Sequence, residues 1–173
     1  MNKISKNQPT LITERLTLRP LSVNDASEIL LLRSDMEINK FLDRKPSKTL
    51  EDALHFIKII LENSETFYWA ITKTGEERLI GTICLYDFSE DRDKCEIGYE
   101  LRTEFQGQGI MLEAATKVIQ YAMESLDVKN IEAFTHKDNQ SSTNLLEKLN
   151  FNDLGSTLIE NPSLILFRLT MIK

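Results

Sequence analysis

Residues 104–111 read Glu104-Phe105-Gln106-Gly107-Gln108-Gly109-Ile110-Met111, with two glycines that are separated by one residue. Alternating apolar residues precede this octet, from Cys95 to Leu101, and apolar residues at helical spacing follow it, from Met111 to Met123. These patterns predict a strand that turns sharply into a helix. Glycine permits positive φ and close approach of a ligand, and the first amides of a helix have no partners inside it. The octet therefore predicts a phosphate or pyrophosphate site, with an ordinary glycine-rich turn as the alternative.

Two common phosphate motifs do not match the octet. The chain has no Gly-x-x-x-x-Gly-Lys-Ser/Thr, and Met111 and Leu112 stand where a dinucleotide fingerprint needs a third glycine. The octet instead resembles the coenzyme A signature of the GNAT superfamily of N-acetyltransferases, Gln/Arg-x-x-Gly-x-Gly/Ala. Gln106 opens the match, Gly109 is its central glycine, and Met111 replaces the usual small last residue. The ribosomal-protein branch (RimJ/RimL type) tolerates Met there, and Glu96-Ile97-Gly98-Tyr99 is also similar to that branch.

The rest of the chain predicts one α+β domain over residues 1–173, with residues 1–9 as a flexible N-terminal extension. Periodicity and capping signals predict strands over 10–21, 67–72, 79–86, 95–101 and 131–135, helices over 22–33, 34–42, 49–61, 111–125 and 141–149, and a closing hairpin over 151–159 and 164–171. The expected order is β-αα-βββ-α-β-α-ββ, with about seven strands in a mostly antiparallel twisted sheet flanked by helices. This is the GNAT order, and the resemblance implies that two parallel strands splay apart around the pantetheine arm of the coenzyme.

Composition excludes several classes of function. The net charge of −6 and the absence of a basic face disfavour nucleic-acid binding, whereas an acidic protein attracts a cationic amine. No apolar run is long enough to span a membrane and no signal peptide is evident, so we expect a cytoplasmic protein. No Cys/His cluster has metal-binding spacing. Cys84 and Cys95 are expected to be reduced thiols, with a disulfide between them left open.

A second motif, Asn139-x-x-Ser142, also resembles the family. The resemblance implies that Asn139 binds the pantetheine arm and that Ser142 donates a hydrogen bond to the departing thiolate. Many members have a tyrosine for that task where this chain has Leu146. The alternative is that Asn139 or Ser141 only caps the helix.

The candidate general bases are Glu96 and Glu100, on one face of the strand before the octet, and Glu160 on the closing hairpin. Each can instead be a solvated surface charge. Strand amides near Tyr99 and Leu101 are expected to bind the acetyl carbonyl and its oxyanion. The expected coenzyme-binding set is Tyr99, Leu101, Gln106, Gly107, Gln108, Gly109, Ile110, Met111, Asn139 and Ser142.

Together these features predict an acetyl-CoA-dependent N-acetyltransferase that acts by direct attack of an amine on the thioester. The expected acceptor is the N-terminal amine of a ribosomal or other protein, and the protein is a monomer or a homodimer. Two alternatives stay open: the same fold acetylating a small amine, such as a polyamine or aminoglycoside, and a non-catalytic coenzyme A-binding module.

Overall fold

A twisted sheet runs through the computed structural model, which describes residues 7–156 and 160–171. Within those residues eight strands pair in the order β1-β2-β3-β4-β5-β6-β8-β7. Their bounds are Leu11–Ile12 (β1), Leu16–Pro20 (β2), Phe67–Lys73 (β3), Leu79–Tyr86 (β4), Lys94–Leu101 (β5), Asn130–His136 (β6), Asn152–Asp153 (β7) and Leu164–Thr170 (β8). The α-helices are Ala26–Ser34 (α1), Met36–Asn39 (α2), Leu50–Glu62 (α3), Ile110–Ser125 (α4) and Gln140–Lys148 (α5), and the 3-10 turns are Val23–Asp25 (η1) and Thr103–Phe105 (η2).

Helix ends follow local sequence signals. Ser22 and Asp25 form a capping box at η1, and Thr49 and Asp52 form another at α3, so each side chain bonds the other residue's backbone amide. Asn150 ends the α5 segment with a φ of 63°, a left-handed conformation that asparagine tolerates. These are the boundaries that the sequence predicts.

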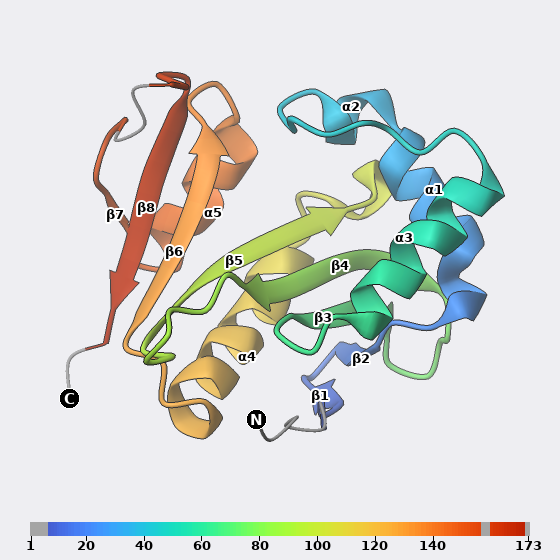
Figure 1. Cartoon of the computed structure of the whole chain (residues 1–173), viewed down its shortest axis with the longest axis horizontal. Coiled ribbons are helices and arrows are strands. Elements are labelled where there is room, and N and C mark those ends of the chain that lie inside the picture. The colour runs from blue at the N-terminus through green and yellow to red at the C-terminus, as the bar shows by residue number, and fades with distance from the viewer. Residues whose placement is uncertain (1–6, 157–159, 172–173) are drawn as a thin grey trace.

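Two apolar clusters, one on each face of the sheet, form the core. The larger packs α4 and α5 against side chains such as Leu16, Ile71 and Ile97. The smaller packs α1 and α3 against side chains such as Tyr68 and Ala70. Figure 1 shows α4 behind the sheet and α1 and α3 in front of it. The side chains of β3 alternate between the two clusters, and those of β5 alternate between the larger cluster and a polar front face, which matches the predicted strand periodicity.

The predicted first strand, 10–21, is two strands. β1 and β2 pair antiparallel, with Leu11 opposite Leu18, around a turn at Thr13 to Arg15. Local bonds close the turn: Thr13 N–H donates to the Leu16 carbonyl at 3.0 Å and Leu16 N–H donates to Thr13 Oγ1 at 3.0 Å. A continuous apolar alternation concealed this turn, since it contains neither glycine nor proline.

Details at the edges of the predicted elements differ. Leu61, at the end of the predicted helix 49–61, is exposed, whereas Ala53 and Ile57 of α3 are fully buried. Within the predicted flexible extension, Gln8 is tied to β3: its side chain donates to the Tyr68 carbonyl at 2.8 Å and accepts from the Tyr68 amide at 3.0 Å. Residues 1–6 of that extension and 157–159 of the predicted hairpin lie outside the described residues.

The cysteines do not face each other. Cys84 is in register with Gly98, so it lies on the opposite sheet face from Cys95, and both thiols are free. Burial raises the pKa of each to about 12, so neither is an activated nucleophile.

Candidate functional site

The octet forms a turn that leaves backbone amides without hydrogen-bond partners at the start of α4. η2 ends at Phe105, and Gly107 and Gly109 then take φ values of 72° and 74°. Gln106 fixes the start of the loop, because its Nε2 donates to the Leu101 carbonyl at 2.9 Å. A residue with a Cβ is strained at such φ values, which explains both glycines.

The amides of this loop are available to a ligand. Across residues 7–156 and 160–171, no acceptor is hydrogen-bonded to the backbone N–H groups from Gly107 to Met111. Gly109 is the N-cap of α4 and provides no side-chain cap for a helix of 16 residues. The helix dipole adds positive potential at the same point. The residues therefore fit an anion such as a diphosphate, as the octet predicts.

A wedge opens between β5 and β6, next to the loop. These neighbours are parallel, and they pair only from Lys94–Asn130 to Glu96–Glu132. Beyond Glu96 the two strands diverge, as Figure 1 shows. Arg102 N–H donates to the Ile80 carbonyl of β4 at 3.0 Å. Because groups alternate along an antiparallel ladder, the backbone groups of Tyr99 and Leu101 then point away from β4, into the wedge. The divergence of β6 frees them without any bulge in the β4–β5 ladder.

Two hydroxyl groups meet across the wedge. Tyr99 Oη of β5 and Ser142 Oγ of α5 are 2.7 Å apart, and either can be the donor. Burial raises the pKa of Tyr99 to about 12 against the opposing effect of the bond to Ser142, so the phenol is protonated at neutral pH. The sequence suggested Ser142 alone, so the tyrosine hydroxyl is an addition. Asn139 Oδ1 accepts from the Ser142 amide at 3.2 Å, which is the helix-capping alternative for this residue.

A cleft lies on the front face, beside β5. It encloses about 300 Å³, and its lining includes Arg33, Arg44, Tyr68, Tyr86 and Glu100. Arg44 binds both carboxylate oxygens of Glu100, one of them at 3.1 Å. The predicted base Glu100 is therefore occupied by a cation that the sequence did not identify, because 56 residues separate the partners.

The loop that carries Arg44 also reaches β6. The rings of Phe41 and His136 are 5.2 Å apart between centroids, so residues 40–49 touch both sides of the wedge. Arg33 lies beneath this loop, with its guanidinium 4.0 Å from the centre of the Phe56 ring. Burial is the main reason that the pKa of Arg33 is lowered, followed by repulsion from Arg44.

Glu96 differs from Glu100 because, among the described residues, no arginine or lysine side chain is paired with its carboxylate. It lies four residues before Glu100 on the same face of β5, in register with Tyr86 of β4. Burial raises its pKa above the ordinary value, more than the hydrogen bond from Tyr86 lowers it, and the charge of Asp87 adds to the rise. A carboxylate with a raised pKa is a better proton acceptor near neutrality. Glu160, the third candidate, is exposed.

Other predicted groups are accounted for. Leu146 is fully buried in the core, where it replaces a tyrosine of the resemblance. In the part of the chain that the structure describes, no cluster of three or more His, Cys, Asp or Glu side chains is arranged to hold a metal ion. Nor does a helix of these described residues have the length and apolarity to cross a bilayer.

Comparison with known proteins bears directly on this geometry. The model of the acetyltransferase (GNAT) domain family matches residues 15–152. An uncharacterized N-acetyltransferase, p20, of Bacillus licheniformis is 34% identical over 150 residues, covering 84% of each chain. The [ribosomal protein uS5]-alanine N-acetyltransferase of Escherichia coli is 27% identical over 157 residues, covering 84% of this chain and 79% of the relative.

A solved structure extends the match to three dimensions. The microcin C7 self-immunity acetyltransferase MccE, in complex with acetyl-CoA and AMP, superposes with a TM-score of 0.76 at 22% identity, covering 92% of this chain and 94% of the other. At that identity the likeness establishes the fold. With the family match over most of the sequence, it follows that the chain belongs to the GNAT family of N-acetyltransferases.

Proposed function

We propose that this protein transfers the acetyl group of acetyl-CoA to the N-terminal amine of a ribosomal or other protein. The observation that carries the proposal is the row of amides from Gly107 to Met111 that have no hydrogen-bond acceptor. They lie next to the wedge that opens after the third residue pair between β5 and β6. GNAT enzymes use acetyl-CoA, and these amides suit its diphosphate. A relative whose name specifies a ribosomal-protein alanine as acceptor supports the choice of acceptor.

The residues around the wedge have complementary tasks in such a transfer. When bound, acetyl-CoA would supply a thioester carbonyl for the amine to attack, with the thiolate as the leaving group. The amides of Tyr99 and Leu101 face the wedge and can stabilise the developing oxyanion. Glu96, with its raised pKa, takes the proton that the nitrogen loses, by way of water in the cleft. The Tyr99–Ser142 hydroxyl pair lies across the wedge and would donate a hydrogen bond, and then a proton, to the departing thiolate.

The acceptor cleft sets the size of the group that reaches the thioester. About 300 Å³ is at the small end of ligand sites in proteins. It suits one terminal residue of a peptide, with the rest of the chain outside, and equally a small amine. The same volume thus favours the second candidate, acetylation of a polyamine or aminoglycoside, as much as the first.

Mass spectrometry of acetylated products separates these candidates. The protein is incubated with acetyl-CoA and a ribosomal protein fraction, then with a panel of small amines. Peptides with free and with chemically blocked N-termini form a matched pair of acceptors. We expect acetyl groups on free N-terminal amines only. Rapid consumption of small amines with proteins unmodified overturns the protein acceptor, and tight binding of acetyl-CoA without turnover on any amine indicates a binding module.

A further inference from the structure

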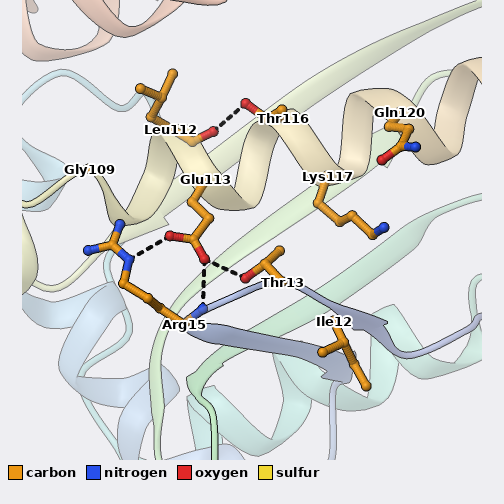
Figure 2. Close-up of a pocket in the computed structure, with 9 residues that line it drawn as sticks. All are labelled: Ile12, Thr13, Arg15, Gly109, Leu112, Glu113, Thr116, Lys117 and Gln120. Carbon is orange, nitrogen blue, oxygen red and sulfur yellow. Dashed lines mark hydrogen bonds and ion pairs between the residues drawn. The ribbon is translucent and has the colours of Figure 1, made fainter.

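Behind the sheet, a groove between α4 and the β1–β2 turn contains a polar network that the proposed chemistry does not use. Figure 2 shows the network, in which the Glu113 carboxylate faces Thr13 and Arg15. One oxygen accepts from Thr13 Oγ1 at 2.6 Å and from the Arg15 amide at 2.9 Å, and the other accepts from Arg15 Nε at 2.6 Å. The two ends of the network are about one hundred residues apart in the chain, so it is a tertiary clamp.

The same arginine reaches the cofactor loop. Arg15 Nη1 donates to the Gln108 carbonyl at 3.0 Å. A Cβ at Gly109 would lie 3.5 Å from Arg15 Nη2, so the guanidinium lies against the left-handed residue of the octet. Glu113, four residues further along α4, holds that guanidinium in place.

The contact between Arg15 and the Gln108 carbonyl also fixes the direction of the Gly109 N–H. The Gln108–Gly109 peptide is trans, since the described residues include no cis bond. In a planar trans peptide the N–H points opposite to the C=O. When Arg15 holds the Gln108 carbonyl toward the groove, the Gly109 amide must therefore point away from the groove, to the open side of the loop.

We propose that Arg15, held by Glu113 and Thr13, is a positioning residue that aims the octet amides at the coenzyme diphosphate. This inference rests on the proposed use of acetyl-CoA. It assigns no ligand to the groove itself: Arg15 acts through the Gln108 peptide, and Glu113 acts through Arg15.

Binding of coenzyme A by calorimetry, with steady-state kinetics, tests the role. Arg15→Met should weaken the binding of coenzyme A about tenfold and raise the KM for acetyl-CoA by a similar factor. This is the effect expected from the loss of one charge-assisted hydrogen bond at a partly exposed site. The kcat and the acceptor KM should stay within about twofold of wild type, because reacting groups are untouched. Arg15→Lys, which lacks the guanidinium fork, should restore only part of the affinity. Lys117→Met is the matched control, since it removes the other cation of the groove, and it should leave affinity unchanged.

Glu113→Gln distinguishes two roles of Arg15 by whether coenzyme A binds more weakly or more tightly. If Arg15 acts by aiming the loop, loss of its anchor weakens coenzyme A binding. If Arg15 merely attracts phosphate by its charge, removing a nearby negative charge strengthens binding and overturns the proposal.

A second readout needs no coenzyme. In the ligand-free protein, the NMR amide resonances of Gly107 to Ile110 should shift in Arg15→Met and not in Lys117→Met. Unmoved resonances overturn the inference even if wild type binds no coenzyme A. Absence of binding by wild type, with the resonances shifted as expected, overturns the proposed function alone.

Discussion

Glu113 behind the sheet and Glu96 in front of it have pKa values displaced in opposite directions. Burial alone would raise the pKa of Glu113, but bonds from Thr13 and Arg15 outweigh it and lower that pKa. Burial raises the pKa of Glu96, and no arginine or lysine in the described residues is bonded to its carboxylate. Glu113 therefore keeps its charge to a lower pH than an ordinary glutamate, and Glu96 takes up a proton at a higher pH.

The rest of each region follows the same division. The side proposed to bind the coenzyme offers main-chain groups. They are fixed by two left-handed glycines and by the hydrogen bond from Gln106 to the Leu101 carbonyl. The acceptor side offers charged side chains, Arg33, Arg44 and Glu100, carried partly by a loop. Backbone groups can bind a ligand whatever side chains surround them, whereas recognition of a particular acceptor depends on a few well-placed polar side chains.

The largest effect is expected from disturbing the backbone of the glycine-containing loop. Gly109→Val places a β-branched residue at a φ of 74° and should weaken coenzyme A binding about 1,000-fold, since several amides lose their aim together. Calorimetry measures the effect. Gly75→Val is the control, because Gly75 has a φ of 82° in open space, far along the chain from the octet. Equal losses of affinity in both variants would mean that strain, not the loop, is responsible.

Removing the proton acceptor tests the other side. Glu96→Gln should lower kcat/KM for the amine about 100-fold, a typical contribution of a general base, and leave coenzyme A affinity unchanged. Wild-type activity should fall as pH decreases through the raised pKa of Glu96, above its ordinary 4.5, because the protonated carboxyl is no base. If Glu96→Gln keeps the wild-type rate and pH profile, Glu96 is not the general base.

The ion pair of the acceptor cleft should have a more limited effect. Arg44→Met frees the loop from Glu100 and should raise the acceptor KM about tenfold by misplacing the substrate, with kcat little changed. Arg92→Met is a suitable control: it breaks an exposed pair with Glu65, 3.0 Å long, at the β4–β5 turn. If the KM for acetyl-CoA changes instead, the two sides are not independent.

The smallest expected effects are on thermal stability, where substitutions at Glu96 and Glu113 should act in opposite directions. At neutral pH, Glu96→Gln should raise Tm by about 2 °C and Glu113→Gln should lower it by a similar amount, since solvent screens both partly exposed groups. The Glu96 difference should vanish as pH falls below its ordinary 4.5, where the native carboxyl is protonated. The Glu113 difference should persist there and vanish only below its lowered pKa. Thermal melts across pH measure both, and shifts of the same sign would refute the contrast.

Much of the fold is local enough to be predicted. Apolar periodicity located β3, β4, β5, α4 and β6, and capping pairs located the starts of η1 and α3. The octet was predictable because glycine spacing and a following helix are properties of one short segment. The turn between β1 and β2 was not, since one of its stabilising partners is the Glu113 carboxylate from α4.

The side-chain partners were beyond reach for the same reason. Glu96 and Glu100 share a strand face, as the sequence indicates, but their surroundings differ. Glu96 is partly buried without a cationic partner, whereas Glu100 is bound by both arms of the Arg44 guanidinium. Arg44, Tyr99 as a partner of Ser142, and the Arg15 network depend on contacts over 43 to 100 residues. No local pattern encodes such pairings.

The wedge has a mechanical consequence. With only three register pairs between β5 and β6, the sheet is two leaves joined along a short seam, and β6, β8, β7 and α5 form the smaller leaf. Few backbone bonds must break for that leaf to open as a cooperative unit, so amide exchange in β6 should reach an opening energy below global unfolding. A molecule bound in the wedge would contact both leaves and hold them together, so slower amide exchange in β6 should report its binding.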